Sequence, residues 1–206
     1  MKDKEYIRKA RLLMRKMTLE EKIGQLNQVG ASIYGTTDEN GYEEMAKNGK
    51  VGSFLSLHNP ERCNKLQRIA VEQSRLGIPL IFAEDVIHGL KTIYPVPLAE
   101  SCSFEPELAC RTAEAAADEA SACGVKWVFA PMTDIARDAR WGRIAEGSGE
   151  DPYIGSLFAA ARVKGFQGGE KGGNIDEKHV AACVKHFACY GAAESGKDYN
   201  TVQLSD

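Results

Sequence analysis

The stretch that decides the fold is Ile78-Pro-Leu-Ile-Phe-Ala-Glu-Asp-Val-Ile-His-Gly89. It opens with a short apolar run typical of a buried strand, and two adjacent carboxylates follow directly. Because charged side chains are costly to bury without partners, they must lie where the strand leaves the core. Proteins built on parallel strands place their chemistry at the carboxyl ends of those strands. The stretch therefore predicts an α/β fold with a site at a strand end.

The same arrangement occurs twice more along the chain. Val125-Lys-Trp-Val-Phe-Ala-Pro-Met132 leads into the cluster Arg137-Asp-Ala-Arg-Trp-Gly-Arg143, and Val180-Ala-Ala-Cys-Val184 leads into Lys185-His-Phe187. Three strands that each end in charged and aromatic residues predict an enzyme or a small-molecule binder.

The predicted elements alternate between strand and helix. We expect strands over 51–57, 78–83, 125–130 and 180–184, and helices over 4–16, 60–76, 106–123 and 152–166. The first helix carries an apolar side that includes Tyr6, Ile7 and Met14. Thr18-Leu-Glu-Glu21 has the spacing of a capping box that opens another helix, and 30–49 is expected to be a loop with one short helical piece.

This alternation favours a parallel sheet with right-handed crossovers. Eight strand–helix units close a barrel of about 250 residues or more, whereas this chain of 206 residues shows four such alternations. The sequence therefore predicts an incomplete TIM-type (β/α) barrel, roughly its first half, with N-terminal helices. We expect residues 1–206 to form a single, incomplete domain.

Composition narrows the function further. With 43% hydrophobic residues, 27% charged residues and a net charge of −3, the chain has no basic surface for nucleic acid and no polybasic patch for a membrane. Its first ten residues are charged where a signal peptide would be apolar, and no apolar run approaches the roughly 20 residues that span a bilayer. These features predict a cytoplasmic protein.

Three segments carry the candidate site residues. Asp85 can accept two hydroxyl hydrogen bonds, although a capping or ion-paired aspartate is the alternative. In the loop that ends at Arg143, nearby acids such as Glu146 are expected to pair with most of the arginines, while one reaches the ligand and Trp141 exposes a face for stacking. Lys185 and His186 can share a ligand only if the backbone bends locally, since neighbours on a strand face opposite ways.

Together these segments resemble the N-terminal barrel domain of glycoside hydrolase family 3, in its bacterial β-glucosidase branch. The matching stretches are Met17–Leu26, Ile78–Gly89, Phe129–Met132, Arg137–Arg143, Gly149–Tyr153 and Lys185–Phe187. The resemblance implies a retaining β-glucosidase that removes terminal nonreducing β-D-glucosyl residues without a cofactor or metal. The loop 188–198 lacks the histidine that the N-acetylglucosaminidase branch carries there.

Site roles follow from the same resemblance. Asp85, Arg143, Lys185 and His186 would bind the hydroxyls of the glucosyl unit, and Asp198 would be a supporting or aglycone-side acid. The Lys-His-Phe segment would have unusual backbone geometry, including cis peptides. The family's nucleophile lies in a later Ser-Asp-Trp-like motif and its acid/base further on, so neither catalytic carboxylate is expected within 1–206, and the isolated chain is expected to be inactive.

Two other functions remain open at this stage. Lys185 could serve as the Schiff-base amine of a lyase or aldolase barrel, or the chain could be a non-catalytic carbohydrate-binding fragment. In every case the open edges of a half-barrel predict self-association or marginal stability. The partner expected is a β-glucoside or an oligosaccharide.

Overall fold

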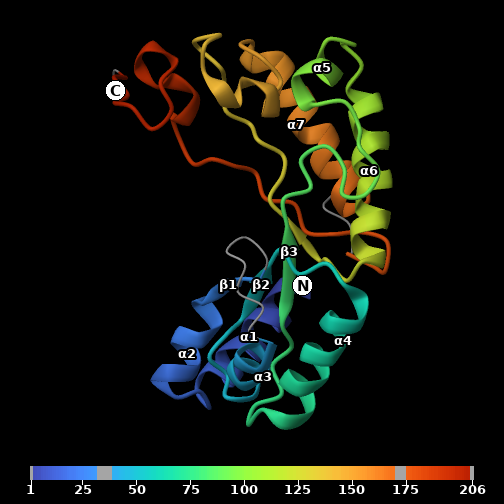
Figure 1. Cartoon of the computed structure of the whole chain (residues 1–206), viewed down its shortest axis with the longest axis vertical. Helices are drawn as coiled ribbons and strands as arrows, with labels where there is room; N and C mark the ends of the chain where they lie inside the picture. Colours follow the sequence, from blue (N-terminus) through green and yellow to red (C-terminus); the bar gives the residue numbers. More distant parts are fainter. Residues whose placement is uncertain (1, 32–38, 170–174, 205–206) are drawn as a thin grey trace. The chain divides into compact units, whose positions relative to one another are not determined.

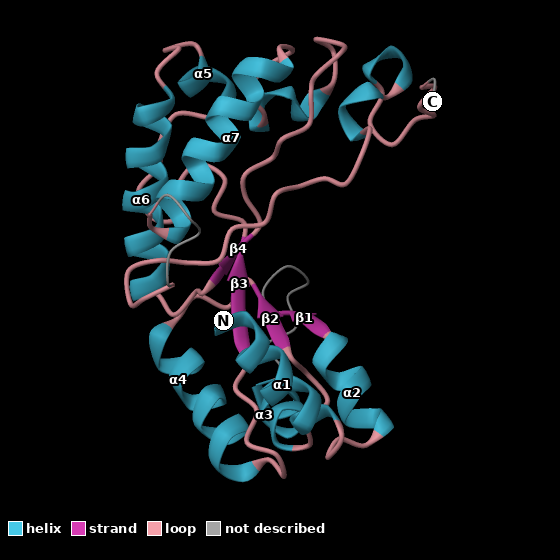
Figure 2. Ribbon diagram, turned by 180° about the vertical axis from the view of Figure 1, so that it is seen from behind, coloured by secondary structure: helices cyan, strands magenta, loops and turns pink. Residues whose placement is uncertain are grey.

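The computed structural model describes residues 2–31, 39–169 and 175–204. The chain forms two compact units, residues 1–83 and residues 84–206. Figures 1 and 2 show the elements of each unit, and every candidate site residue falls in the second one.

The first unit alternates helices with short parallel strands. β2 pairs with β1 on one side and with β3 on the other, and Ser53 is the register partner of both Gln28 and Ile81. Its elements are α1 (Lys2–Met14), α2 (Leu19–Leu26), β1 (Gln28–Gly30), α3 (Glu39–Lys47), β2 (Ser53–Leu55), α4 (Pro60–Arg68), a π-helical turn (Ile69–Gln73) and β3 (Ile81–Glu84).

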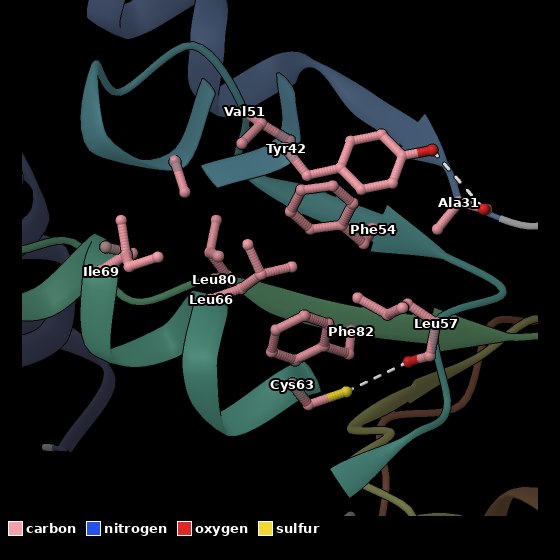
Figure 3. Packing of buried hydrophobic residues seen from close by; sticks show 12 residues of the cluster. Ala31, Tyr42, Val51, Phe54, Leu57, Cys63, Leu66, Ile69, Leu80 and Phe82 are labelled. Carbon is pink, nitrogen blue, oxygen red and sulfur yellow. Dashed lines mark hydrogen bonds between the residues drawn. The ribbon is translucent and has the colours of Figure 1, made fainter. Parts of the chain in front are cut away.

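Aromatic side chains on these strands form the core of the first unit. Phe54 stacks on Phe82 with ring centroids 6.1 Å apart, and Tyr42 packs edge-on against Phe54 at 5.3 Å. Leu66 and Ile69 reach the same cluster from the helical side (Figure 3). Burying large apolar side chains between a sheet and its helices is the main stabilising contribution in such a unit.

The N-terminal helices confirm one prediction and correct another. The capping box is present, because the Glu21 N–H donates to the Thr18 hydroxyl at 3.2 Å while the Thr18 N–H donates to the Glu21 carboxylate at 2.8 Å. The apolar side predicted for the first helix is not buried, since Tyr6, Ile7 and Met14 are each more than half exposed. Helical periodicity alone does not supply a surface to pack against.

Three predicted boundaries in the first unit also differ. β1 precedes the expected loop and was not predicted, because three residues are too few for a period to show. The helix expected over 60–76 is α-helical only to Arg68 and continues as the π-helical turn. The expected strand 51–57 is shortened to β2.

The second unit is built around two long helices that lie side by side in both views (Figures 1 and 2). Small residues let them approach closely: a Cβ added at Gly165 of α7 would lie 2.2 Å from the carbonyl oxygen of Cys110 on α6. Alanines line the facing side of α6, among them Ala113 and Ala117. The elements of this unit are α5 (Pro97–Ser101), α6 (Pro106–Ala122), β4 (Trp127–Val128), α7 (Pro152–Gln167) and three 3₁₀ segments (Gly142–Glu146, Tyr190–Ala192 and Glu194–Gly196).

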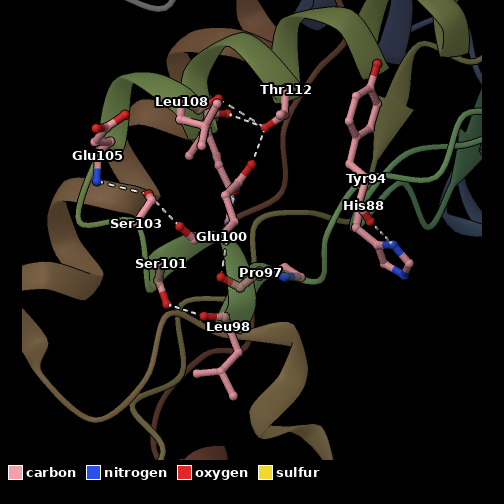
Figure 4. A network of polar contacts seen from close by, with 12 residues as sticks. His88, Tyr94, Pro97, Leu98, Glu100, Ser101, Ser103, Glu105, Leu108 and Thr112 are labelled. Carbon is pink, nitrogen blue, oxygen red and sulfur yellow. Dashed lines mark hydrogen bonds and ion pairs between the residues drawn. The ribbon is translucent and has the colours of Figure 1, made fainter.

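A buried ion pair joins α5 to α7. The Arg162 guanidinium donates to Glu100 Oε2 from Nη2 at 2.5 Å and from Nε at 3.1 Å, and both side chains are only 5% exposed. The Thr112 hydroxyl donates to the other oxygen of the same carboxylate, so Glu100 is the centre of a saturated polar network (Figure 4). Such saturation is what makes a buried charge tolerable.

The strand predicted over 180–184 is replaced by a broken pairing. Two isolated parallel bridges remain: Trp127 pairs with Ala181, and Met132 pairs with Lys185. From the first bridge to the second, one segment advances by five residues and the other by four. The extra residue is a bulge, and Pro131 falls within it and has no N–H to donate. Backbone bonds continue through the irregular stretch: the Cys183 N–H donates to the Ala130 carbonyl at 2.9 Å, and the Thr133 N–H donates to the Lys185 carbonyl at 2.6 Å. The irregularity lies directly before Lys185 and His186.

Candidate functional site

Asp85 and Lys185 meet although they are 100 residues apart in the chain. Asp85 follows β3, and Lys185 follows the segment that pairs with residues 126–133. The Lys185 ammonium donates to Asp85 Oδ1 at 3.1 Å, with the lysine side chain 15% exposed and the aspartate side chain 49% exposed. The aspartate therefore keeps an open side on which a ligand hydroxyl can donate to it.

His186 is held between an anion and a cation. Its backbone N–H and its ring Nδ1 both bond to Asp134 Oδ2, at 3.0 Å and 2.8 Å, and its Nε2 lies 3.4 Å from Arg143 Nη1. The Lys185–His186 peptide bond is cis. The unusual backbone that the resemblance implies at this segment is therefore present.

Arg143 is anchored on one side and open on the other. Its Nε and Nη2 donate to the two oxygens of Glu146, both at 2.6 Å, a bidentate pair of the strongest kind. Hydrogen bonding to Glu146 raises the pKa of Arg143, and the same bonds lower the pKa of Glu146. With those donors occupied, Nη1 points toward His186 Nε2 and the Tyr190 hydroxyl, each at 3.4 Å.

Tyr190 is the residue that sequence reasoning missed. Its ring packs edge-on against His186 at 4.7 Å and against Trp141 at 5.2 Å, and the Arg143 guanidinium lies 5.3 Å from its centroid. Burial is the main cause that raises the pKa of Tyr190 to about 12. Nothing local marks this tyrosine in the sequence, because its importance comes only from what the fold places around it.

A glycine explains how the tyrosine loop comes so close. A Cβ added at Gly191 would lie 2.3 Å from the Ile135 carbonyl oxygen and 3.3 Å from the Asp134 Cβ. Any larger residue there would push the loop away from the segment that carries Asp134.

The prediction that Trp141 exposes a stacking face is wrong. Trp141 is 2% exposed and packs with Met132 and Ala136. Its indole N–H donates to Asp198 Oδ1 at 2.9 Å, and this bond is the largest cause that lowers the pKa of Asp198. The buried indole thereby ties its loop to Asp198. A large ring with one polar atom is stable when it is buried, provided that this atom has a hydrogen-bond partner.

Part of the site borders a hollow of about 500 Å³, whose lining does not include Asp85 or Lys185. Its lining combines Arg143 and His186 with the rings of Tyr190 and Tyr199. The structure thus brings Asp85, Lys185, His186 and Arg143 into one chain of contacts. Asp198 is joined to it through Trp141 and Tyr190. The cluster offers hydrogen-bond donors and acceptors on neighbouring atoms, which suits a ligand rich in hydroxyl groups.

The remaining sequence candidates have structural partners. Arg140 pairs with Asp138 through two bonds of 3.0 Å and 2.6 Å, as expected for the arginine-rich loop. His88 contacts the Tyr94 carbonyl through Nδ1 at 3.0 Å. Over residues 2–31, 39–169 and 175–204, no three His, Cys, Asp or Glu side chains are grouped to hold a metal ion.

Comparison with known proteins assigns the chain to a family. Residues 18–206 match the model of the glycosyl hydrolase family 3 N terminal domain. The chain belongs to this family. It is 40% identical over 193 residues to the periplasmic β-glucosidase of Salmonella typhimurium, covering 94% of this chain and 25% of that protein.

Solved structures of the family support the same assignment. The β-glucosidase of Listeria innocua in complex with glucose is 41% identical to this chain and gives a TM-score of 0.85. The match covers 96% of this chain and 29% of the Listeria chain. A variant of that enzyme with laminaribiose gives a TM-score of 0.84 at 40% identity, with the same coverage. The predicted α/β fold with parallel strands is confirmed, and the chain spans about a quarter of the length of the curated relatives it matches. In the described part of the family 3 chain, no helix combines the length and apolarity needed to cross a bilayer.

Proposed function

We propose that this family 3 chain forms the glucosyl-binding part of a retaining β-glucosidase. Asp85, Lys185, His186 and Arg143 bind the hydroxyls of a terminal nonreducing β-D-glucosyl unit, and Asp198 supports them from the aromatic side. The observation that carries the proposal is the continuous chain of contacts from Asp85 through Lys185 and His186 to Arg143, beside an open hollow. The relatives solved with glucose and with laminaribiose bind sugars of this class.

The contacts explain why such a cluster would favour a sugar. Each of three side chains is already oriented by a neighbour: Lys185 by Asp85, His186 by Asp134 and Arg143 by Glu146. Side chains held in place lose less conformational entropy when a ligand binds. Hydrogen bonds to charged groups contribute about 1.5–3 kcal/mol each, so a few well-oriented ones give useful affinity for a hydrophilic ligand.

The Schiff-base alternative fits the geometry poorly. A lysine that attacks a carbonyl needs a neutral amine in an apolar pocket or beside another cation. Lys185 instead donates to the Asp85 carboxylate, so its neighbour is neither apolar nor a cation. Borohydride treatment with a carbonyl substrate should therefore leave Lys185 unmodified, and covalent trapping on Lys185 would favour the lyase.

Isothermal titration of the chain with glucose and laminaribiose tests the proposal. We expect Asp85→Ala to weaken binding by roughly tenfold or more, the worth of one charged hydrogen bond. Asp138→Ala is the matched control, because Asp138 also pairs with a cation but lies outside the cluster. Equal affinity in the Asp85 and Asp138 variants would contradict the assignment. Saturable binding without turnover, even in a full-length family 3 frame, would favour the non-catalytic carbohydrate-binding function.

Catalysis requires more than these residues. Retaining hydrolysis needs one carboxylate to attack the anomeric carbon and another to protonate the leaving group, whereas Asp85, Asp134 and Glu146 are each engaged by a cation or an imidazole. We predict that the polypeptide 1–206 alone does not hydrolyse an aryl β-glucoside. Joined to the remainder of a family 3 β-glucosidase, it should do so. Turnover by the 206-residue chain would mean that Glu84, Glu146 or Asp198 has a catalytic role.

Two further predictions concern the state of the chain. We expect it to self-associate or to be marginally folded, because among the described strands β1 pairs only with β2 and lies at an edge of the sheet. A clean monomer in light scattering with a sharp melt would contradict this. The cytoplasmic location also stays a prediction, and the Salmonella relative is named a periplasmic enzyme.

A further inference from the structure

A buried carboxylate stands behind the proposed sugar contacts without lining the hollow. The Asp134 side chain is 3% exposed, and its Oδ2 receives both the His186 backbone N–H and the ring Nδ1. Because a carboxylate can only accept, Nδ1 must carry a proton in this arrangement.

The opposite side of the ring fixes the second nitrogen. Arg143 Nη1 is a donor in every state of the guanidinium, and it lies 3.4 Å from His186 Nε2. A protonated Nε2 would set two donors against each other, so the contact is favourable only when Nε2 carries a lone pair. Among the described residues, the other groups near the ring are the Tyr190 face at 4.7 Å, the adjacent Lys185 and the charged Glu146 carboxylate. Each Glu146 oxygen already accepts from Arg143, through Nε and Nη2.

We propose that Asp134 is a positioning residue that locks His186 in the neutral Nδ1–H form. His186 then presents a hydrogen-bond acceptor, not a donor, to the site. Resting on the proposed function, this adds a specificity rule: because Nε2 has one lone pair, a sugar hydroxyl that meets it must donate its proton there in place of Arg143 Nη1. Lys185 and the released Nη1 then donate to other sugar oxygens. Hydrogen bonding on one ring nitrogen commonly decides the role of the other.

Nitrogen-15 NMR of the chain tests the locked form without any sugar. Four histidines are present, and His186→Gln assigns the His186 signals by their disappearance. At neutral pH we expect His186 Nδ1 to show the shift of a protonated nitrogen and Nε2 that of an unprotonated one. Two protonated nitrogens, or a proton on Nε2 alone, would overturn the proposal.

Two variants separate positioning from mere packing. Asp134→Asn keeps an oxygen that can accept both bonds, so the Nδ1–H form should persist. Asp134→Ala removes the acceptor, and the His186 shifts should move toward an average of the two neutral forms, with glucose affinity lower by about two- to tenfold, the worth of one hydrogen bond. An unchanged His186 spectrum in Asp134→Ala would refute the role. Amide spectra report whether the Ala variant is folded, and if it is not, the wild-type and Asn spectra still decide.

The readouts also keep this inference apart from the proposed function. If the chain binds no sugar but His186 is locked as described, the proposed function fails while the tautomer assignment stands. If glucose binds but His186 carries its proton on Nε2, the function stands and the inference fails.

Discussion

Two polar clusters in the second unit use the same residue types for different ends. Glu100 and Arg162 pair between α5 and α7 with both side chains 5% exposed, and Thr112 takes up the remaining carboxylate oxygen. Around Arg143, the acids likewise occupy the cations, but Asp85, Arg143 and His186 are between 25% and 49% exposed. The difference is that the first cluster is saturated and closed, whereas the second leaves donors and acceptors facing a hollow. Pairing alone therefore does not reveal function, but pairing beside unfilled space does.

The largest expected effect breaks the closed cluster. Arg162→Met should lower the free energy of unfolding by about 3–5 kcal/mol, because it leaves the Glu100 carboxylate buried without its cation. Urea unfolding measures this change. The double variant Glu100→Gln with Arg162→Met is the control, and it should recover much of the loss since no lone charge stays buried. A double variant as unstable as the single one would show that packing, not charge, holds α5 to α7.

The corresponding change in the open cluster should affect binding and leave folding nearly intact. Lys185→Met keeps the aliphatic stem but removes the ammonium, so glucose affinity should fall roughly tenfold or more, the worth of a charged hydrogen bond. The unfolding free energy should change by less than about 1 kcal/mol, because Asp85 is half-exposed and water can replace the ion pair. Calorimetric titration and urea unfolding of one preparation give both values. A large loss of unfolding free energy with unchanged glucose affinity would show that Lys185 stabilises the fold, as Arg162 does, and does not bind the sugar.

A pH titration sharpens the comparison within the open cluster. Hydrogen bonds from Arg143 lower the pKa of Glu146 in the folded protein below its ordinary 4.5. The stabilisation from this pair is therefore complete above pH 4.5 and is lost as the pH falls through the lowered folded pKa. Glu146→Gln should unfold more easily than the wild type at neutral pH, and the gap should close in acid. If the difference in unfolding free energy between the two proteins stayed constant as the pH falls, the lowered pKa of Glu146 would be contradicted.

The smallest effect is expected outside both clusters. Arg140 is 73% exposed and pairs with Asp138, whose pKa the bonds from Arg140 lower to about 2. Arg140→Ala should raise the pKa of Asp138 toward its ordinary 3.8, as carbon-13 NMR of the carboxyl group would show. The urea midpoint and the glucose affinity should not change measurably, since exposed pairs are screened by water. A clear loss of affinity would extend the site to this loop.

The sequence by itself determined the fold class and the residues of the cluster. Apolar runs that end in Asp85 and in Lys185-His186 indicated parallel strands with chemistry at their carboxyl ends, and Thr18 with Glu21 announced a helix start that the structure contains. These signals are local: each depends on residue type and on spacings of a few positions, which the chain shows directly.

Only the tertiary structure decided what each side chain does. It buried Trp141, which the sequence offered as an exposed stacking surface, and it left exposed Tyr6 and Ile7, which the sequence placed on one apolar side of a helix. It also made Tyr190 the centre of the aromatic contacts and set Asp134 behind His186, 52 positions away. Burial and partnership depend on which distant segments meet, as residues 127–132 meet residues 181–185 through two separate bridges. The sequence specifies the residue types, but the contacts of each side chain are set only when distant segments pack together in the folded chain.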